Sequence, residues 1–344
     1  MSCDVKETKM GQLGKQSIRF ERPPYLYCGA SVVGPKEGEG PLQSTFDEII
    51  SDPMAGMDNW EAAESEMVLR AATLVLQKAG LQNTDIRYCF AGDLLAQLIA
   101  TTFGVCNLDI PLFGLYGACS TCGEALALAS MTVAAGYAKR TLAIASSHFA
   151  SAEKQFRYPL EYGNQRPLAA TWTVTGAGAF IVGDEPSSIQ IAGITTGKIT
   201  DYGVRDSMNM GAAMAPAAAS LIYQCLQDFQ VSPSYFDRII TGDLGMVGKG
   251  ILIKLLNDNG IDILSQHMDC GIEIFDNDAQ DTHAGGSGCG CSAVTLAGMI
   301  SDKLTKREWT RVLFVPTGAL LSTVSYNEGQ SVPGIAHGII LESV

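Results

Sequence analysis

The sequence predicts an α/β protein built from two similar halves, and three observations point to this fold class. Apolar stretches at residues 86–95 and 236–245 each contain a Gly-Asp-Leu motif, at Asp93 and Asp243. Each stretch is preceded by a helical pattern. Each is followed by a cysteine-containing turn, a small-residue helical pattern and another apolar strand. A repeat of this kind predicts a duplicated supersecondary unit.

The expected elements alternate between strand and helix, which predicts buried parallel sheets covered by helices. In chain order they are helix 60–78 closed by Gly80, strand 86–95, strand 140–147, strand 173–182, helix 212–229, strand 236–241, strand 311–318 and strand 335–342. A Glu-Pro turn at residues 184–188 divides the chain into an N-terminal half, 20–184, and a C-terminal half, 185–344. Residues 148–170 show no pattern, so we expect a long loop there.

The composition predicts a protein with a large core that does not bind nucleic acid. Of the 344 residues, 47% are hydrophobic and 17% charged, and the net charge of −13 opposes contact with a phosphate backbone. Ten scattered cysteines are typical of buried, reduced thiols. The longest stretches of low polarity contain Gly or Pro and are too short to span a bilayer. We therefore expect a soluble chain that acts at a membrane only peripherally.

Cys119 is the strongest candidate for a functional side chain. It stands where the run 112–118 ends and a small-residue helical pattern begins, and Cys289 stands at the matching turn of the second half. A thiol at a helix N-terminus meets the positive end of the helix dipole, which favours thiolate and attracts anions. The alternatives are a buried packing thiol, a redox pair with Cys122, and a four-thiolate metal site with Cys122, Cys289 and Cys291. The redox pair lacks the usual flanking aromatic and Pro residues, and the spacing of the four thiols is poor for zinc.

Two aspartates and the cations of the unpatterned loop are further candidates. Asp93 and Asp243 follow strand ends, where α/β sheets place ligands, but helix capping explains them equally simply. His148 and Arg157 concentrate positive charge after the strand 140–147, which suits either an anion pocket or a solvated basic loop. His283, just before the second cysteine turn, is either a base for Cys119 or a histidine bonded within its loop. Nucleotide-binding loops are missing, so no cofactor is expected.

These motifs resemble the thiolase superfamily across nearly the whole chain. The run into Cys119, the strand at 175–179 and the glycine-rich turn at 285–291 lie where that superfamily has them. The turn matches the one that carries the catalytic Asn in ketoacyl-ACP synthase III enzymes. The resemblance implies a thiolase-like fold, in which two duplicated βαβαβαββ halves form a five-layer αβαβα sandwich.

Further motifs resemble a family of stage V sporulation proteins within this superfamily. They lie at residues 34–42, 91–95, 117–121, 155–159, 161–163, 214–219, 283–289 and 335–338. That family is linked to uptake of dipicolinic acid into the forespore. The resemblance therefore implies dipicolinate as a ligand, a peripheral place at the forespore or spore inner membrane, and membrane proteins of the stage V sporulation A complex as partners.

One departure from the condensing enzymes bears on catalysis. Those enzymes pair their cysteine with His-Asn or His-His, but the positions that match these partners here hold Asp243 and Cys289. Cys119 keeps its turn and lacks a base in the usual place. The first hypothesis is therefore a non-catalytic protein that binds dipicolinate. The alternative is an acyl-transferring condensing enzyme with Cys119 as nucleophile. A third interpretation is a scaffold protein with a vestigial site.

The proposed ligand site is a cavity above Cys119. Its expected lining residues are Cys119, Asp93, His148, Arg157, Asp243, His283 and Cys289. No resident metal is expected, although calcium would reconcile the acidic groups with a dianion. Thiolase-like folds pair through an edge strand, so we also expect a homodimer, with residues 141–146 as the candidate edge.

Overall fold

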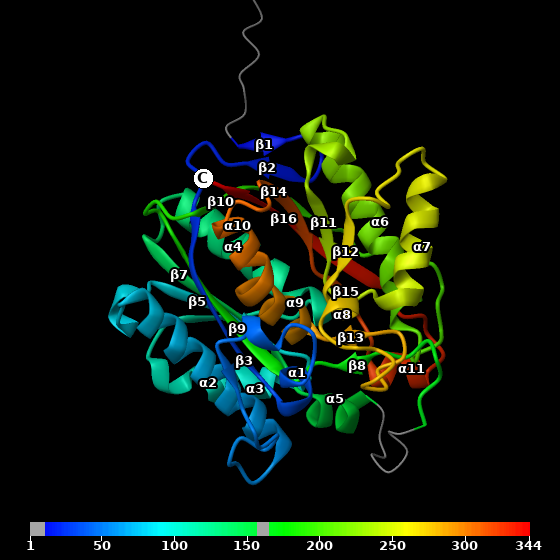
Figure 1. Ribbon diagram of the computed structural model, residues 1–344, viewed down its shortest axis with the longest axis horizontal. Helices are drawn as coiled ribbons and strands as arrows, with labels where there is room; N and C mark the ends of the chain where they lie inside the picture. The colour runs from blue at the N-terminus through cyan, green and yellow to red at the C-terminus, as the bar shows by residue number, and fades with distance from the viewer. Residues whose placement is uncertain (1–10, 157–164) are drawn as a thin grey trace, which may run out of the picture.

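Two five-stranded sheets with the same strand order form the framework of the protein (Figure 1). The structure is a computed structural model that describes residues 11–156 and 165–344. The sheets meet at a single residue pair, Tyr25 opposite Gln190, between β3 and β10. The duplication expected from the repeated motifs is therefore confirmed in the strand order, while the division at residues 184 and 185 stays a prediction.

The N-terminal sheet has the order β3-β9-β7-β5-β6. These strands are β3 (Tyr25–Val33), β9 (Gly176–Gly183), β7 (Arg140–Ser147), β5 (Tyr88–Gly92) and β6 (Leu112–Gly114). The C-terminal sheet repeats the order as β10 (Ile189–Thr196), β16 (Gly334–Ser343), β14 (Arg311–Val315), β11 (Arg238–Thr241) and β12 (His267–Asp269).

Both sheets are mixed, so the expectation of parallel sheets is wrong for one strand in each. β9 and β16 run antiparallel to both of their neighbours, while the other four strands of each sheet share one direction. Every residue of β9 is buried, so its apolar pattern matches that of a central parallel strand. The sequence therefore identifies these strands as buried without giving their direction.

Helices form three layers around the two sheets (Figure 1). The outer N-terminal face is covered by α2 (Trp60–Ala79) and α3 (Ile99–Val105), and the outer C-terminal face by α6 (Met210–Phe229) and α7 (Gly245–Asn257). The central layer holds α4 (Thr121–Ala134) and α9 (Cys289–Thr295), which continues through Leu296–Ile300 into α10 (Ser301–Thr305). This is the five-layer thiolase-like arrangement that the resemblance implied.

The shorter elements lie at the ends and edges of these layers. They are β1 (Gln12–Leu13), β2 (Ser17–Arg19), α1 (Pro35–Gly38), β4 (Glu48–Ile49), α5 (Phe149–Phe156), β8 (Trp172–Thr173), α8 (Cys270–Glu273), β13 (Gly286–Ser287), β15 (Thr317–Ala319) and α11 (Thr323–Asn327). The parallel pair β8–β13 joins the two halves near the Cys119 turn. The expected loop at 148–170 is wrong at its start, because α5 buries Ala152 and Glu153 on one face.

The two long helices begin and end as their sequences indicate. Asn59 caps α2 by accepting a hydrogen bond from the Ala62 N–H at 2.9 Å, and Gly80 ends it with φ of 67°. Asn209 caps α6 in the same way, accepting from the Ala212 N–H at 3.2 Å. Each helix packs its buried face against its own sheet, so the repeat in sequence becomes a repeat in packing.

The strand expected as the dimer edge is internal. Residues 141–146 belong to β7, which is hydrogen-bonded to β5 on one side and to β9 on the other. The edge of the N-terminal sheet is β6, whose Leu112 and Phe113 side chains are exposed. Any pairing of copies through this sheet would therefore use β6.

A glycine-to-alanine change tests how tightly the central helices contact the sheets. A Cβ at Gly178 of β9 would lie 2.7 Å from the backbone of Ala293 in α9. We expect Gly178→Ala to lower the free energy of unfolding by about 1–3 kcal/mol because the helix must move outward. Gly250→Ala in α7, where a Cβ meets nothing within 4 Å, is the matched control and should be neutral or stabilising. Urea unfolding followed by circular dichroism measures both, and equal stability of the two variants would contradict the packing.

Candidate functional site

Cys119 lies at a sharp turn where the central layer begins. The turn Ala118–Ser120 leads directly into α4, and Ala118 adopts a positive φ of 49°, which is strained for a residue with a side chain. β15 packs closely against the turn, because a Cβ added at Gly318 would lie only 2.2 Å from the Gly117 carbonyl oxygen. The packing of β15 against the turn therefore holds Cys119 in a fixed position.

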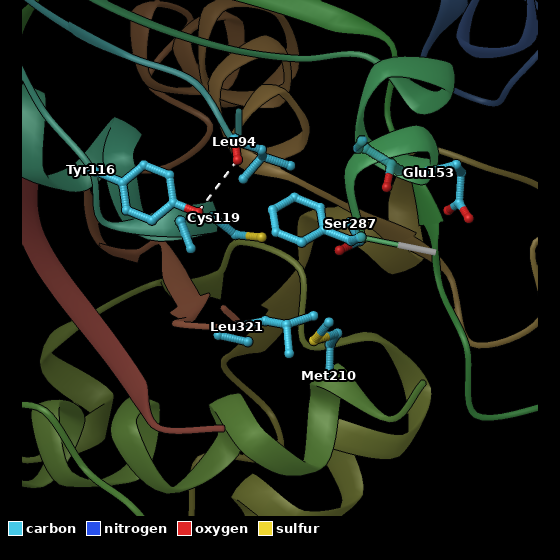
Figure 2. A pocket seen from close by; sticks show the side chains of 12 residues that line it. Leu94, Tyr116, Cys119, Glu153, Met210, Ser287 and Leu321 are labelled. Atoms are coloured by element: carbon cyan, nitrogen blue, oxygen red, sulfur yellow. Dashed lines mark hydrogen bonds between the residues drawn. The ribbon is translucent and has the colours of Figure 1, made fainter. Parts of the chain in front are cut away.

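The Cys119 side chain lines a pocket between the two halves. The pocket encloses about 520 Å³, including the part open to solvent. Figure 2 shows the Cys119 Sγ pointing into the space between Leu94, Ser287, Met210 and Leu321. The other lining residues are Tyr116, Ala118, Ala152, Glu153, Phe156, Thr173 and Ala319. Most of these side chains are apolar, and the polar atoms come from a thiol, hydroxyls and the Glu153 carboxylate.

Asp243 is the ionisable partner of Cys119. Its Oδ2 accepts hydrogen bonds from the Gly288 N–H at 2.9 Å and the Ser287 hydroxyl at 3.3 Å, while its Oδ1 is buried and has no hydrogen-bond partner among the described residues. Burial raises the pKa of Asp243 to about 7. Burial, together with the neighbouring Asp243 carboxyl, raises the pKa of Cys119 well above its ordinary value. The thiol is therefore kept protonated, contrary to the activation that the helix dipole alone predicts.

Cys289 lies behind Cys119 and does not line the pocket. Its thiol donates a hydrogen bond to the Ser146 carbonyl oxygen at 2.8 Å, and burial raises its pKa well above the ordinary value. Gly288, at φ of 101°, begins α9, and a Cβ there would lie 2.5 Å from the Ser147 Oγ. The second cysteine turn thus supports the first one and supplies Ser287 to the pocket wall.

Asp93 is a structural carboxylate, as the capping interpretation predicts. It is fully buried, and its two oxygens accept hydrogen bonds from the Leu95 N–H at 2.8 Å and the Thr101 N–H at 2.7 Å. Thr101 is in the first turn of α3, so the carboxylate satisfies a donor at the N-terminus of that helix. The structure does not bring Asp93 to the pocket.

The two candidate histidines are also bonded away from Cys119. His148 is buried, with Nε2 2.9 Å from the Pro53 carbonyl oxygen and Nδ1 accepting from the Ala150 N–H at 3.1 Å. His283 has Nδ1 3.0 Å from the Pro167 carbonyl oxygen and Nε2 3.0 Å from the Asp281 carboxylate. The expectation that either one lines the pocket, or that His283 serves as a base for Cys119, is therefore wrong. Arg157 lies outside the described residues.

Two cations that flank the undescribed residues form ion pairs, although the Nε and Nη1 of Arg166 are buried without a partner among the described residues. Lys154 forms an ion pair with Glu61 at 2.7 Å, and Arg166 pairs with Asp281 at 3.1 Å.

No group of three or more His, Cys, Asp or Glu side chains in residues 11–156 and 165–344 is arranged to hold a metal ion. Of the part of the chain described, no helix is long and apolar enough to cross a membrane.

Sequence reasoning missed several residues that line the pocket. Tyr116 stands three residues before Cys119, and its hydroxyl donates to the Leu94 carbonyl oxygen at 3.3 Å (Figure 2). Glu153 is the carboxylate within the basic stretch, directly before Lys154, and that position was its only signal. Met210 and Leu321 come from the second half and carry no local motif, so only the fold could place them.

Removing the Asp243 carboxylate should make Cys119 more reactive. Asp243→Asn keeps the shape and one acceptor but removes the charge that raises the pKa of Cys119. We expect alkylation of Cys119 by iodoacetamide at pH 8 to become several-fold faster, as measured by peptide mass spectrometry. Asp93→Asn, at the matching position of the first half, is the control and should leave the rate unchanged. Equal alkylation rates of Cys119 in Asp243→Asn and in the protein without the substitution would contradict the influence of Asp243 on Cys119.

The raised pKa of Asp243 also predicts how stability depends on pH. The pKa is higher in the folded protein (about 7) than in the unfolded chain (3.8), so the folded state binds a proton more tightly. The resulting contribution to stability is complete below pH 3.8 and is lost as the pH rises to about 7. We expect Asp243→Asn to flatten the decline in urea midpoint between these values, while the exposed control Asp278→Asn leaves it unchanged. A decline identical in both variants would contradict the assignment.

Comparison with known proteins identifies the family. The family model for Stage V sporulation protein AD matches residues 14–342. Stage V sporulation protein AD of Bacillus subtilis (strain 168) is 44% identical over 329 residues, which cover 96% of this chain and 97% of that protein.

Solved structures with the same fold include several condensing and acyl-transferring enzymes. They are the acyltransferase ChlB3 (TM-score 0.57, 13% identity, 94% of this chain and 98% of that one), 3-oxoacyl-[acyl-carrier-protein] synthase III of Aquifex aeolicus VF5 (TM-score 0.54, 12% identity, 93% and 99%) and an OleA variant of Xanthomonas campestris (TM-score 0.56, 13% identity, 96% and 99%). At this identity they show the thiolase-like fold alone. By the family model and the Bacillus relative, the chain belongs to the Stage V sporulation protein AD family.

Proposed function

We propose that this protein binds dipicolinate in the pocket above Cys119 and serves its uptake into the developing spore without transferring acyl groups. The sporulation family and the pocket between the halves support the ligand and the place where it binds. The observation that carries the proposal is that the ionisable neighbour of Cys119 is a carboxyl group, Asp243, while the candidate histidines are bonded elsewhere.

Acyl transfer needs a thiolate or a base that can create one. The chain has four histidines, all within the described residues, and none of them hydrogen-bonds to Cys119. His337, the fourth, is buried, and burial lowers its pKa to about 4. The proposal therefore treats Cys119 as part of a binding surface.

The pocket has features that suit a small planar diacid. Phe156, Leu94 and Met210 supply apolar contacts for a ring, while the Thr173 hydroxyl and the Cys119 thiol supply hydrogen-bond donors for carboxylates. Asp243 does not line the pocket, but its protonation below about pH 7 removes a nearby negative charge that opposes a dianion.

The proposal extends to location and partners. We propose a peripheral place at the forespore or spore inner membrane, held by membrane proteins of the stage V sporulation A complex. A homodimer through β6 is consistent with the exposed edge and with Phe113, whose side chain is 52% exposed. In that arrangement β6 would pair with its copy and cover this apolar edge.

Calorimetric titration with dipicolinate, with and without calcium, tests the proposal. We expect saturable binding that weakens about 2- to 10-fold in Cys119→Ala and in Thr173→Val, the loss of one hydrogen bond each. Cys106→Ala, an exposed cysteine outside the pocket, is the matched control and should bind unchanged. Affinity should rise as the pH falls through about 7, since Asp243 then carries its proton. No saturable binding, or binding equal in all variants, would refute the proposed site.

A further inference from the structure

The helix α5 forms one wall of the Cys119 pocket and is tied to α2 by polar contacts. Three of its residues line the pocket, and they are Ala152, Glu153 and Phe156. On the side that faces α2, the Ser151 Oγ lies 2.7 Å from the Glu64 Oε2, and Lys154 forms an ion pair with Glu61 at 2.7 Å. The position of this wall of the pocket therefore depends on how α2 holds α5.

Glu64 is the buried member of these contacts. Both Glu64 and Ser151 are 1% exposed. The Glu64 Oε1 accepts a hydrogen bond from the Ser146 hydroxyl of β7 at 2.9 Å, so this one carboxyl group joins the sheet to α5. Among residues 11–156 and 165–344 no cation pairs with Glu64, because the nearby Lys154 is bonded to Glu61. An ionised Glu64 would be a buried, unpaired charge, which is costly.

The hydroxyl of Ser151 indicates where a proton on Glu64 belongs. The Ser151 Oγ has two hydrogen-bonding neighbours, the Glu64 Oε2 at 2.7 Å and the His148 carbonyl oxygen at 3.1 Å. The hydroxyl has a single hydrogen, and a carbonyl oxygen can only accept. Both contacts are hydrogen bonds together only if Ser151 donates to the carbonyl oxygen and a protonated Glu64 donates to Ser151. The ionised carboxylate would leave one of the two contacts without a hydrogen.

The surroundings of Glu64 also favour its protonated form. Burial raises the pKa of Glu64 to about 8, and the nearby carboxyl groups of Asp93, after β5, and Glu61, on α2 itself, act in the same direction. The other titratable side chains on the neighbouring elements are Lys154 and Glu153 of α5, His148 after β7 and Cys289 of α9. The cation among these four is Lys154, and its ion pair is with Glu61.

We propose that a proton on Glu64 anchors α5 to α2 and so sets the position of one wall of the Cys119 pocket. This inference concerns the regulation of the site named in the proposed function and rests on it. With its proton, the neutral carboxyl links Ser146 of the sheet to Ser151 of α5. Without it, α5 must move outward so that water can reach the carboxylate. A ligand that contacts α5 favours the anchored position.

The direction of the pH dependence follows from the two states of α5. Glu64 binds its proton more tightly in the anchored position, where its pKa is about 8, than as an exposed carboxyl, where it is 4.5. The contribution of the proton to anchoring is therefore complete below pH 4.5 and is lost as the pH rises to about 8.

Hydrogen–deuterium exchange of the full-length, ligand-free protein tests the anchor, read by mass spectrometry on the amides of residues 150–156. After correction for the intrinsic exchange rate, we expect protection to fall about 10-fold or more between pH 6 and 8.5. Glu64→Gln keeps a neutral side chain that donates to Ser151, so its protection should not change with pH. Glu66→Gln, a partly exposed neighbour that pairs with Arg70 at 2.8 Å, is the matched control and should keep the pH dependence.

Two further measurements test the link from Glu64 to α5 and from α5 to the pocket. Ser151→Ala removes the hydroxyl and leaves the carboxyl intact, so it should lower the protection of α5 at pH 6. Saturating dipicolinate should raise the protection of α5 in the protein without substitutions, because a ligand stabilises the state that it binds.

The proposal is overturned by any of four results. They are protection of α5 that does not change with pH, a change in Glu64→Gln as large as in the protein without substitutions, protection at pH 6 that Ser151→Ala leaves intact, and dipicolinate that binds without slowing exchange in α5. The ligand-free measurements do not involve dipicolinate. The absence of dipicolinate binding would therefore refute the proposed function and leave the anchor standing, while failure of the ligand-free measurements would refute the anchor alone.

Discussion

The contact of the two central helices with both sheets is the constraint on which the structure depends. α4 and α9 fit between the sheets because these helices and the facing strand β9 are rich in Gly, Ala, Ser and Cys. At Gly123 a Cβ would lie 2.9 Å from the His337 carbonyl oxygen, and at Gly178 it would lie 2.7 Å from Ala293. Small residues at these contacts bring backbone close to backbone, as dense packing requires.

This close approach also creates the site. Both helices begin at the centre of the molecule, so their N-terminal turns bring Cys119, Ser287 and Asp243 together from segments far apart in the chain. The same burial that packs the helices removes water from the thiol and the carboxyl, and it raises the pKa of both. The neighbour of the thiol is a carboxyl group, which adds to the effect of burial and favours the protonated form of Cys119.

The sequence was sufficient for the repeat, the α/β class and the position of Cys119, because each rests on local patterns. It could not give strand direction, since β9 is as apolar as a parallel strand, nor the bonding of His148 and His283, which depends on carbonyl groups distant in the chain. Asp243 was identified from the repeat, but its contact with Cys119 is a tertiary one. Met210 and Leu321 reach the pocket only through the pairing of the two halves, so no local signal marks them.

The central claim is that Cys119 forms part of a binding surface and is not a nucleophile. The crystal structure of the protein grown with saturating dipicolinate and an acyl-coenzyme A tests it most directly. The account predicts a planar ligand over an unmodified Cys119 Sγ, in contact with Ser287 and Phe156. Density for a thioester on Cys119, or dipicolinate bound elsewhere with this pocket empty, would contradict it.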